Sequence, residues 1–118
     1  GASKAIAFVL KELGIKYLKV SRHPRKKKEI AYKDLTKKMI NEHTVIINCT
    51  PLGTFPKVNQ KPNIPYQHLG KNNLLYDLIY NPEKTAFLQE GEDRGAQIKN
   101  GLEMLELQAE ESWRIWNR

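Results

Sequence analysis

The apolar residues near the start of the chain recur at the spacing of one helical face. Ile6, Leu10 and Leu13 are separated by four and then three residues, and Gly14 follows where a helix commonly ends. This spacing predicts a helix over residues 2–13. Residues 15–20 then alternate as in a short strand, which the Ser21-Arg22-His23-Pro24 stretch brings to an end.

Weaker helical spacing and a strand pattern follow. Leu35 and Met39 indicate a short amphipathic helix, with Asp34 or Thr36 near its start. Residues 44–48 are rich in β-branched side chains, which favour a buried strand.

Turn residues separate this strand from the next one. Thr50-Pro51-Leu52-Gly53 has the composition of a turn, and the prolines among residues 54–72 predict a long loop. Residues 74–80 are apolar at both odd and even positions, which is typical of a parallel strand buried on both faces.

The last third of the chain predicts two helices around a short strand. Asn81 and Pro82 are favoured residues at a helix start and predict a helix running to about Arg94. A short strand over residues 96–98 follows. From Gly101 onward one stripe predicts a final helix, and its members are Leu102, Leu105, Ala109, Trp113 and Trp116.

Strands and helices that alternate with short connections predict an α/β fold with an open parallel sheet, because parallel strands require a crossover and helices usually supply it. With 118 residues, of which 40% are hydrophobic, we expect a single domain. Ligands of such sheets bind beyond the carboxyl ends of the strands. The segments that follow the strands are therefore the places to search for a site.

Charge and cysteine content narrow the class of protein. No apolar stretch reaches the length of a membrane span, and the lone Cys49 rules out a disulfide framework, so we expect a cytoplasmic protein. His23, His43 and His68 lack the spacing of metal ligands. The net charge of +7 is local, since nine basic residues lie between positions 19 and 38 against only two acidic ones.

Two of the strand-end segments suggest a nucleotide ligand. Gly1 opens the chain directly before a helix, and helix amino termini favour phosphate, although a plain helix start fits equally well. Arg22 follows a predicted strand, where an arginine accommodates the 2′-phosphate of NADP and an acidic residue would favour NAD. The competing interpretation of residues 22–28 is a solvated surface loop.

Four stretches in register together resemble the C-terminal half of the shikimate dehydrogenases. They are Gly1-Ala2-Ser3-Lys4-Ala5, Asn48-Cys49-Thr50-Pro51-Leu52-Gly53, Tyr76-Asp77-Leu78-Ile79-Tyr80-Asn81-Pro82 with Thr85, and Asn100-Gly101-Leu102-Glu103-Met104-Leu105 with Gln108. The resemblance implies a Rossmann-like, doubly wound parallel sheet and an NADP-dependent oxidoreductase that reduces 3-dehydroshikimate to shikimate. It makes residues 1–118 the NADP-binding domain, truncated at its N-terminus so that the first strand is missing.

The resemblance also assigns the pyrophosphate and adenosine contacts of NADP. Gly1 and Ala2 correspond to the end of the glycine-rich pyrophosphate loop. Ser21-Arg22-His23 corresponds to the Asn-Arg-Thr stretch that holds the 2′-phosphate, with Ser21 in place of the usual asparagine. Arg25 and Lys26 are expected to add further contacts.

At the other end of the cofactor, the resemblance places Leu78 and Gly101 against the nicotinamide through their backbones, with Thr50 nearby. Tyr80 and Gln108 are expected to reach the substrate, shikimate or 3-dehydroshikimate. On pattern alone these residues also fit packing and turn roles. The catalytic lysine and aspartate of the family belong to an N-terminal substrate-binding domain that is absent from this sequence, so no residue of the chain is assigned as catalytic.

Other functions and partners stay open at this point. A relative acting on quinate or another cyclic hydroxy acid fits the same cofactor residues. A small basic nucleic-acid-binding protein fits the charge cluster, but the cluster lacks interleaved aromatic residues, and we expect no nucleic-acid partner. A missing central strand would leave neighbouring strand edges unpaired, so we expect the chain to self-associate or to belong to a longer polypeptide.

Overall fold

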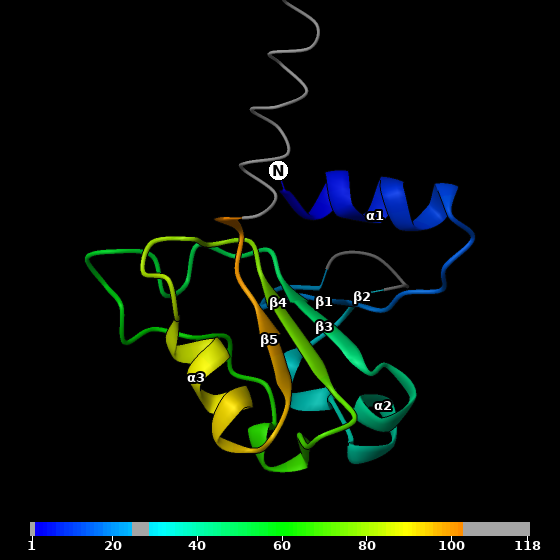
Figure 1. Cartoon of the computed structure of the whole chain (residues 1–118). Coiled ribbons are helices and arrows are strands. Elements are labelled where there is room, and N and C mark those ends of the chain that lie inside the picture. The colour runs from blue at the N-terminus through cyan, green and yellow to red at the C-terminus, as the bar shows by residue number, and fades with distance from the viewer. Residues whose placement is uncertain (1, 25–28, 103–118) are drawn as a thin grey trace, which may run out of the picture.

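The computed structural model describes residues 2–24 and 29–102, and it confirms an α/β fold in which every pair of neighbouring strands is parallel (Figure 1). In chain order the elements are α1 (Ala2–Glu12), β1 (Lys19–Val20), β2 (Glu29–Ile30), the 3₁₀ turn η1 (Tyr32–Asp34), α2 (Lys37–Glu42), β3 (Val45–Asn48), the 3₁₀ turn η2 (Tyr66–His68), β4 (Leu74–Asp77), α3 (Ala86–Asp93) and β5 (Gln97–Lys99).

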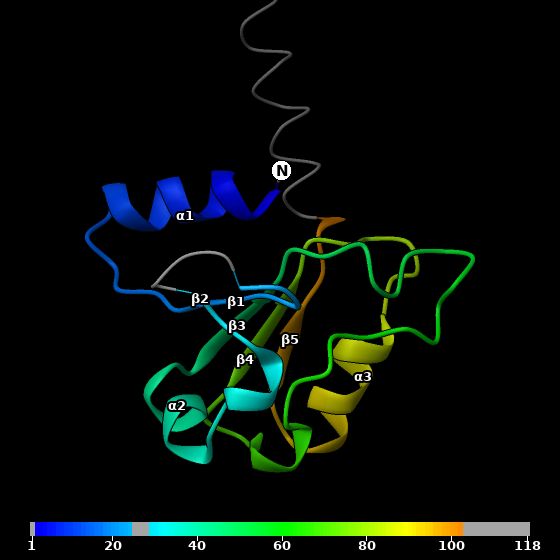
Figure 2. The ribbon, with the colours of Figure 1, turned by 180° about the vertical axis from the view of Figure 1, so that it is seen from behind.

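The described strands form two sheets, whereas the sequence predicted one. The larger sheet has the order β3-β4-β5, and β1 and β2 form a separate pair. The pair lies on the β3 side of the larger sheet, away from β5 (Figures 1 and 2). Among the described residues β1 pairs only with β2, and β3 pairs only with β4. One edge of β1 and one edge of β3 therefore carry backbone groups without a strand partner in this part of the chain.

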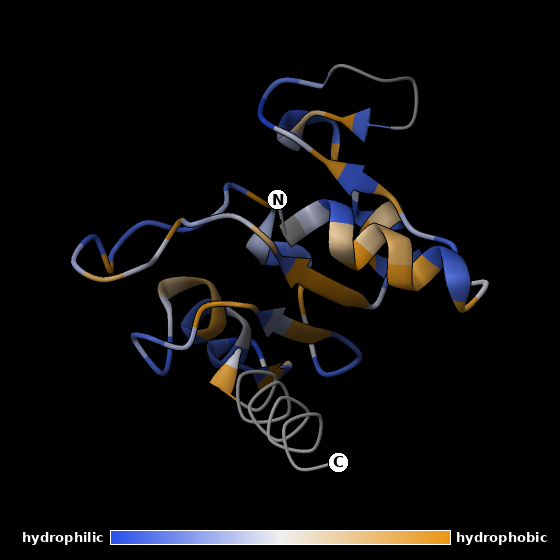
Figure 3. Ribbon diagram, turned by 90° about the horizontal axis from the view of Figure 1, so that it is seen from above, coloured by the Kyte–Doolittle hydropathy of each residue, from blue (hydrophilic) through white to orange (hydrophobic). Residues whose placement is uncertain are grey.

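Helix α1 confirms the first predicted element but does not bury its whole apolar face. It ends at Glu12, and the turn that follows contains Gly14, whose φ of +70° is a conformation that glycine adopts without a steric penalty. The amide of Ile15 donates to the carbonyl of Leu10 over 2.9 Å and closes the helix end. Leu13, however, is 67% exposed and Val9 is 50% exposed. Hydrophobic colour runs along much of α1 when the molecule is seen from above (Figure 3).

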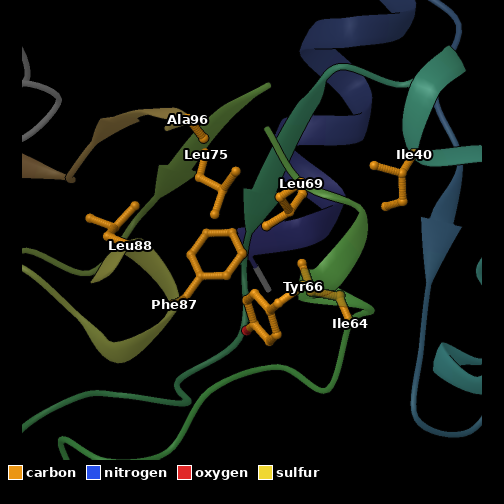
Figure 4. Close-up of a cluster of buried hydrophobic side chains, with 8 residues drawn as sticks. All are labelled: Ile40, Ile64, Tyr66, Leu69, Leu75, Phe87, Leu88 and Ala96. Atoms are coloured by element: carbon orange, nitrogen blue, oxygen red, sulfur yellow. The ribbon is translucent and has the colours of Figure 1, made fainter. Parts of the chain in front are cut away.

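The buried core lies around β4 and α3 (Figure 4). It joins Ile40 of α2, Leu75 of β4 and a cluster from the loop before β4, from α3 and from the turn before β5, whose members are Ile64, Tyr66, Leu69, Phe87, Leu88 and Ala96. The rings of Tyr66 and Phe87 meet edge to face with centroids 6.4 Å apart. The Tyr66 hydroxyl donates to the carbonyl of Pro62 over 2.6 Å, so this loop is anchored to the core.

Several predicted boundaries were wrong. The strand predicted over residues 15–20 is confined to Lys19–Val20, and the one predicted over 74–80 ends at Asp77. The helix predicted from Asn81 begins only at Ala86, because the Thr85 side chain is its cap and accepts from the Leu88 amide. The strand β2 was not predicted, since its two residues are too few to show a period. The last predicted helix lies almost entirely outside the described residues.

Candidate cofactor-binding site

The carboxyl ends of β3 and β4 are joined by a buried pair of polar side chains. Asn48 and Asp77 are the last residues of their strands and lie opposite each other in the ladder. The Asn48 Nδ2 donates to Asp77 Oδ1 over 3.2 Å. Asn48 is 3% exposed and Asp77 is fully buried, so the bond forms away from water. This pair ties the two strand-end turns together at the edge where ligands of parallel sheets bind.

Asn48 also shapes the turn that follows β3. Its Oδ1 accepts from the Thr50 amide over 3.0 Å and from the Thr50 hydroxyl over 2.7 Å. The Thr50 hydroxyl oxygen accepts in turn from the Leu52 amide. Gly53 then adopts a φ of +100° and comes close to Thr85. Thr50 is therefore held by its own side chain in a fixed, half-buried position.

The backbone after β4 is fixed from two sides. The Leu78 amide donates to the carbonyl of Asn48, and the Ile79 amide donates to Asp77 Oδ1 over 3.0 Å. On the other side, the Gly101 amide donates to the carbonyl of Ile79 over 3.2 Å. A Cβ at position 101 would overlap the Leu78 carbonyl, so the contact requires glycine. Thr50, Leu78 and Gly101, which the resemblance predicts to lie at one end of the cofactor, thus lie on one sheet edge.

Tyr80 lies beyond these residues and is 51% exposed, so it is not a core side chain. The neighbouring Asn81 carbonyl accepts from the amide of Phe55, whose side chain is 66% exposed. The segments after β3 and after β4 therefore stay together past their turns. Two large aromatic side chains belong to this exposed region.

The second group of predicted residues lies on the smaller sheet. The Ser21 amide extends the β1–β2 pairing by donating to the carbonyl of Ile30 over 2.9 Å, and the Ser21 hydroxyl accepts from the His23 amide. Arg22 and His23 are exposed. Burial raises the pKa of the Tyr32 hydroxyl, and the positive charge of Arg22 partly opposes that rise. Arg22 is thus an accessible cation directly after a parallel strand.

Some of the expected site residues cannot be placed. Ala2 is the first residue of α1, as expected for a helix start. Gly1, Arg25, Lys26 and Gln108 lie outside the described residues.

Sequence reasoning overlooked the polar network beneath the site. The sequence patterns indicated Asn48, Asp77 and Thr85 only as parts of a motif or a strand. All three side chains are buried, and Asn48 and Thr85 each donate a hydrogen bond to Asp77. Polar residues at the last position of two adjacent apolar strands were the signal that could have revealed them, since buried polar groups require partners.

The described residues give less support to other kinds of site, such as a reactive thiol or a metal site. Burial raises the pKa of the Cys49 thiol, the negative charge of Asp77 adds to the rise, and Lys19 opposes it. The described residues contain no cluster of histidine, cysteine, aspartate and glutamate side chains that could bind a metal ion. No helix within them has the length and apolar character needed to cross a membrane.

Comparison with known proteins gives consistent matches over nearly the whole chain. A shikimate dehydrogenase (NADP(+)) of Desulforamulus reducens is 33% identical over 134 residues, which cover 98% of this chain and 46% of that protein. No protein-family model matches the chain.

Solved structures agree with this match. A chorismate mutase/shikimate 5-dehydrogenase fusion protein from Clostridium acetobutylicum is 36% identical, with a TM-score of 0.79 over 99% of this chain and 43% of that one. The chain is a relative of the shikimate dehydrogenases. The enzyme of Thermus thermophilus, crystallised with NADP(H) and shikimate, is 26% identical with a TM-score of 0.74, and the match covers 95% of this chain and 44% of that one. The chain thus spans less than half the length of these shikimate dehydrogenases, and the Rossmann-like fold expected from the sequence is confirmed.

Proposed function

We propose that this chain is the nucleotide-binding part of an NADP-dependent shikimate dehydrogenase, which reduces 3-dehydroshikimate to shikimate. The observation that carries the proposal is the joining of the Thr50, Leu78 and Gly101 segments at the carboxyl edge of parallel strands. Ligands of this fold bind at that edge. The match to shikimate dehydrogenases over nearly the whole chain supports the reaction class.

The adenosine end of NADP fits the smaller sheet. Arg22 is exposed immediately after β1, and a guanidinium can bind a phosphate through two parallel hydrogen bonds. Ser21 and His23 flank it, and no carboxylate occupies the place that would favour NAD. Gly1 and Ala2 are proposed to meet the pyrophosphate, with Arg25 and Lys26 as further cations.

The nicotinamide end fits the larger sheet. At the close contact of Gly101 with Leu78 backbone meets backbone, so no side chain at position 101 would stand in the way of a flat ring. Bound NADPH would supply a hydride there. Tyr80, whose side chain is half exposed, is proposed to reach the substrate together with Gln108. No residue of this chain is proposed to transfer the proton.

Calorimetric titration of the chain with NADP⁺ and NAD⁺ tests the cofactor. We expect saturable binding that prefers NADP⁺ and a loss of that preference in Arg22→Ala. Arg94→Ala is the matched control, because Arg94 is an exposed arginine at the carboxyl end of α3, on the amino-terminal side of β5. Binding that is indifferent to the 2′-phosphate, or equally weakened in both variants, would contradict the assignment of Arg22.

We further propose that the isolated chain self-associates. Val9, Leu13 and Ile15 expose half or more of their surface in and after α1, and Val45 at the open edge of β3 is 53% exposed. Unpaired strand edges and exposed apolar side chains both favour association with another chain.

A further inference from the structure

Asp77 is a fully buried carboxylate that forms no ion pair with any described cation. A buried charge without a counter-ion is unfavourable unless hydrogen bonds replace the lost water. Three donors do so: Asn48 Nδ2 and the Ile79 amide bind Oδ1, and the Thr85 hydroxyl binds Oδ2 over 2.7 Å. The three donors fix the position of the carboxylate, and the carboxylate in turn fixes the positions of the donors.

The three donors come from the end of β3, the residues after β4 and the start of α3. Asn48 holds the Thr50 turn through two bonds to its Oδ1. Ile79 follows Leu78 and accepts from the Gly101 amide. Thr85 caps α3. Every described residue proposed for the nicotinamide end is therefore one hydrogen bond or one peptide bond away from a partner of Asp77.

The adenosine end is separate from this network. Ser21 and Arg22 belong to the β1–β2 pair, which shares no strand pairing with the larger sheet among the described residues. Asp77 makes none of its hydrogen bonds to β1, β2 or the residues that follow them. A change at Asp77 should therefore act on one end of the cofactor and spare the other.

We propose that Asp77 is a positioning residue for the nicotinamide half of NADP, acting through Asn48 and Ile79 on the backbone of Thr50, Leu78 and Gly101. The inference rests on the proposed function. The inference concerns how the segments that contain Thr50, Leu78 and Gly101 lie relative to one another. It assigns Asp77 no contact with the cofactor. Removing the carboxylate should let the strand-end turns shift relative to one another.

Asp77→Ala tests the proposal by removing both carboxylate oxygens. Asn48 Nδ2, the Ile79 amide and the Thr85 hydroxyl then lose their common acceptor, so the links to both strand-end turns are broken. The readout is a pair of dissociation constants, one for NADP⁺ and one for 2′,5′-ADP, which carries the 2′-phosphate but no nicotinamide.

We expect the wild-type chain to bind NADP⁺ more tightly than 2′,5′-ADP. In Asp77→Ala the affinity for NADP⁺ should fall by about tenfold, the usual scale for a disrupted buried hydrogen bond, whereas the affinity for 2′,5′-ADP should stay within about twofold. Ile40→Val is the control for stability alone, because Ile40 is a buried residue of α2 and makes no bond to the network. It should leave the ratio of the two affinities unchanged.

Asn48→Ser provides a second variant, which decides the question if Asp77→Ala does not fold. It removes the link between Asp77 and the Thr50 turn and should lower the same ratio. Equal loss of both ligands, no loss of either, or a wild-type chain that binds NADP⁺ no better than 2′,5′-ADP would each overturn the role of Asp77. A wild-type chain that binds neither ligand would overturn the proposed function itself.

Discussion

Gly101 lies directly against the carbonyl of Leu78, so close that a Cβ on Gly101 would overlap the carbonyl oxygen. The two residues are 23 positions apart in the sequence and follow the adjacent strands β4 and β5. The contact is between backbone atoms, so no rotation of a side chain could relieve an added methyl group. Gly101 is therefore required for the way the two strand ends meet, whatever ligand they bind.

Gly101→Ala should destabilise the fold and shift the strand ends apart. Overpacking of this kind typically costs about 1–3 kcal/mol in the free energy of unfolding. Gly70→Ala is the matched control, because a Cβ there would meet no atom within 4 Å and the residue does not need a left-handed φ. Urea unfolding of both variants measures the difference. Equal midpoints for the two would show that the Leu78 contact yields without cost.

Thr85→Val should destabilise the chain more than a lost helix cap alone. The hydroxyl of Thr85 both caps α3 and donates to the buried Asp77, so its removal leaves a carboxylate oxygen without a donor. We expect a cost of about 2–4 kcal/mol, from the cap and the unsatisfied oxygen together.

Thr36→Val isolates the contribution of a cap. The Thr36 side chain caps α2 by accepting from the Met39 amide, but Thr36 is exposed and no bond joins its hydroxyl to a buried side chain of the described residues. Its loss should cost about 1 kcal/mol. Thermal unfolding of the two variants gives the comparison, and similar losses would argue that the Thr85–Asp77 bond contributes little.

The turns that follow the strands could be predicted from the sequence because each depends on only a few neighbouring residues. Arg22 after a strand and the Thr50-Pro51-Leu52-Gly53 turn depend on a few neighbouring residue types, and the helix end at Gly14 depends on one. The order of strands and helices followed from apolar spacing for the same reason.

The network of Asp77 could not be predicted in this way, because it joins residues that are far apart in the sequence. Asn48 lies 29 positions from Asp77, and only the parallel register of β3 and β4 brings them opposite each other. The start of α3 was mispredicted for a related reason. Asn81 and Pro82 have good local preferences for a helix start, but Thr85 has a second partner in Asp77 and therefore sets the cap.

Alkaline pH should destabilise the folded chain. Burial is the largest cause that raises the pKa of Cys49, Tyr32 and Tyr66 above their ordinary values of 9.0 and 10.0. Between the unfolded and folded pKa the native state holds more protons than the unfolded state, so the free energy of unfolding falls as pH rises. This contribution is fully present below about pH 8 and is lost progressively from about pH 9 upward.

Tyr66→Phe isolates one source of that dependence. The variant loses the hydrogen bond to Pro62 and should be less stable at neutral pH by about 1 kcal/mol. Its stability should then fall less steeply than that of the wild type between pH 9 and 11, because one buried proton no longer has to be released. Urea unfolding across this range measures the slope, and parallel curves for the two proteins would contradict the assignment.

Self-association should depend on the exposed apolar side of α1. Val9 and Leu13 are one helical turn apart and are 50% and 67% exposed, so replacing both with glutamine removes a continuous apolar patch while keeping good helix formers. Sedimentation velocity should find the wild type associated and this double variant monomeric. Because the chain carries a net charge of +7, association should strengthen as added salt screens the repulsion between copies of the chain.

Phe55→Gln is the matched control for the double variant, since Phe55 is equally exposed but lies in the loop after β3. The control variant should associate like the wild type. A monodisperse wild-type monomer that melts cooperatively would rule out the association and show that α1 and the open strand edges are stable in water.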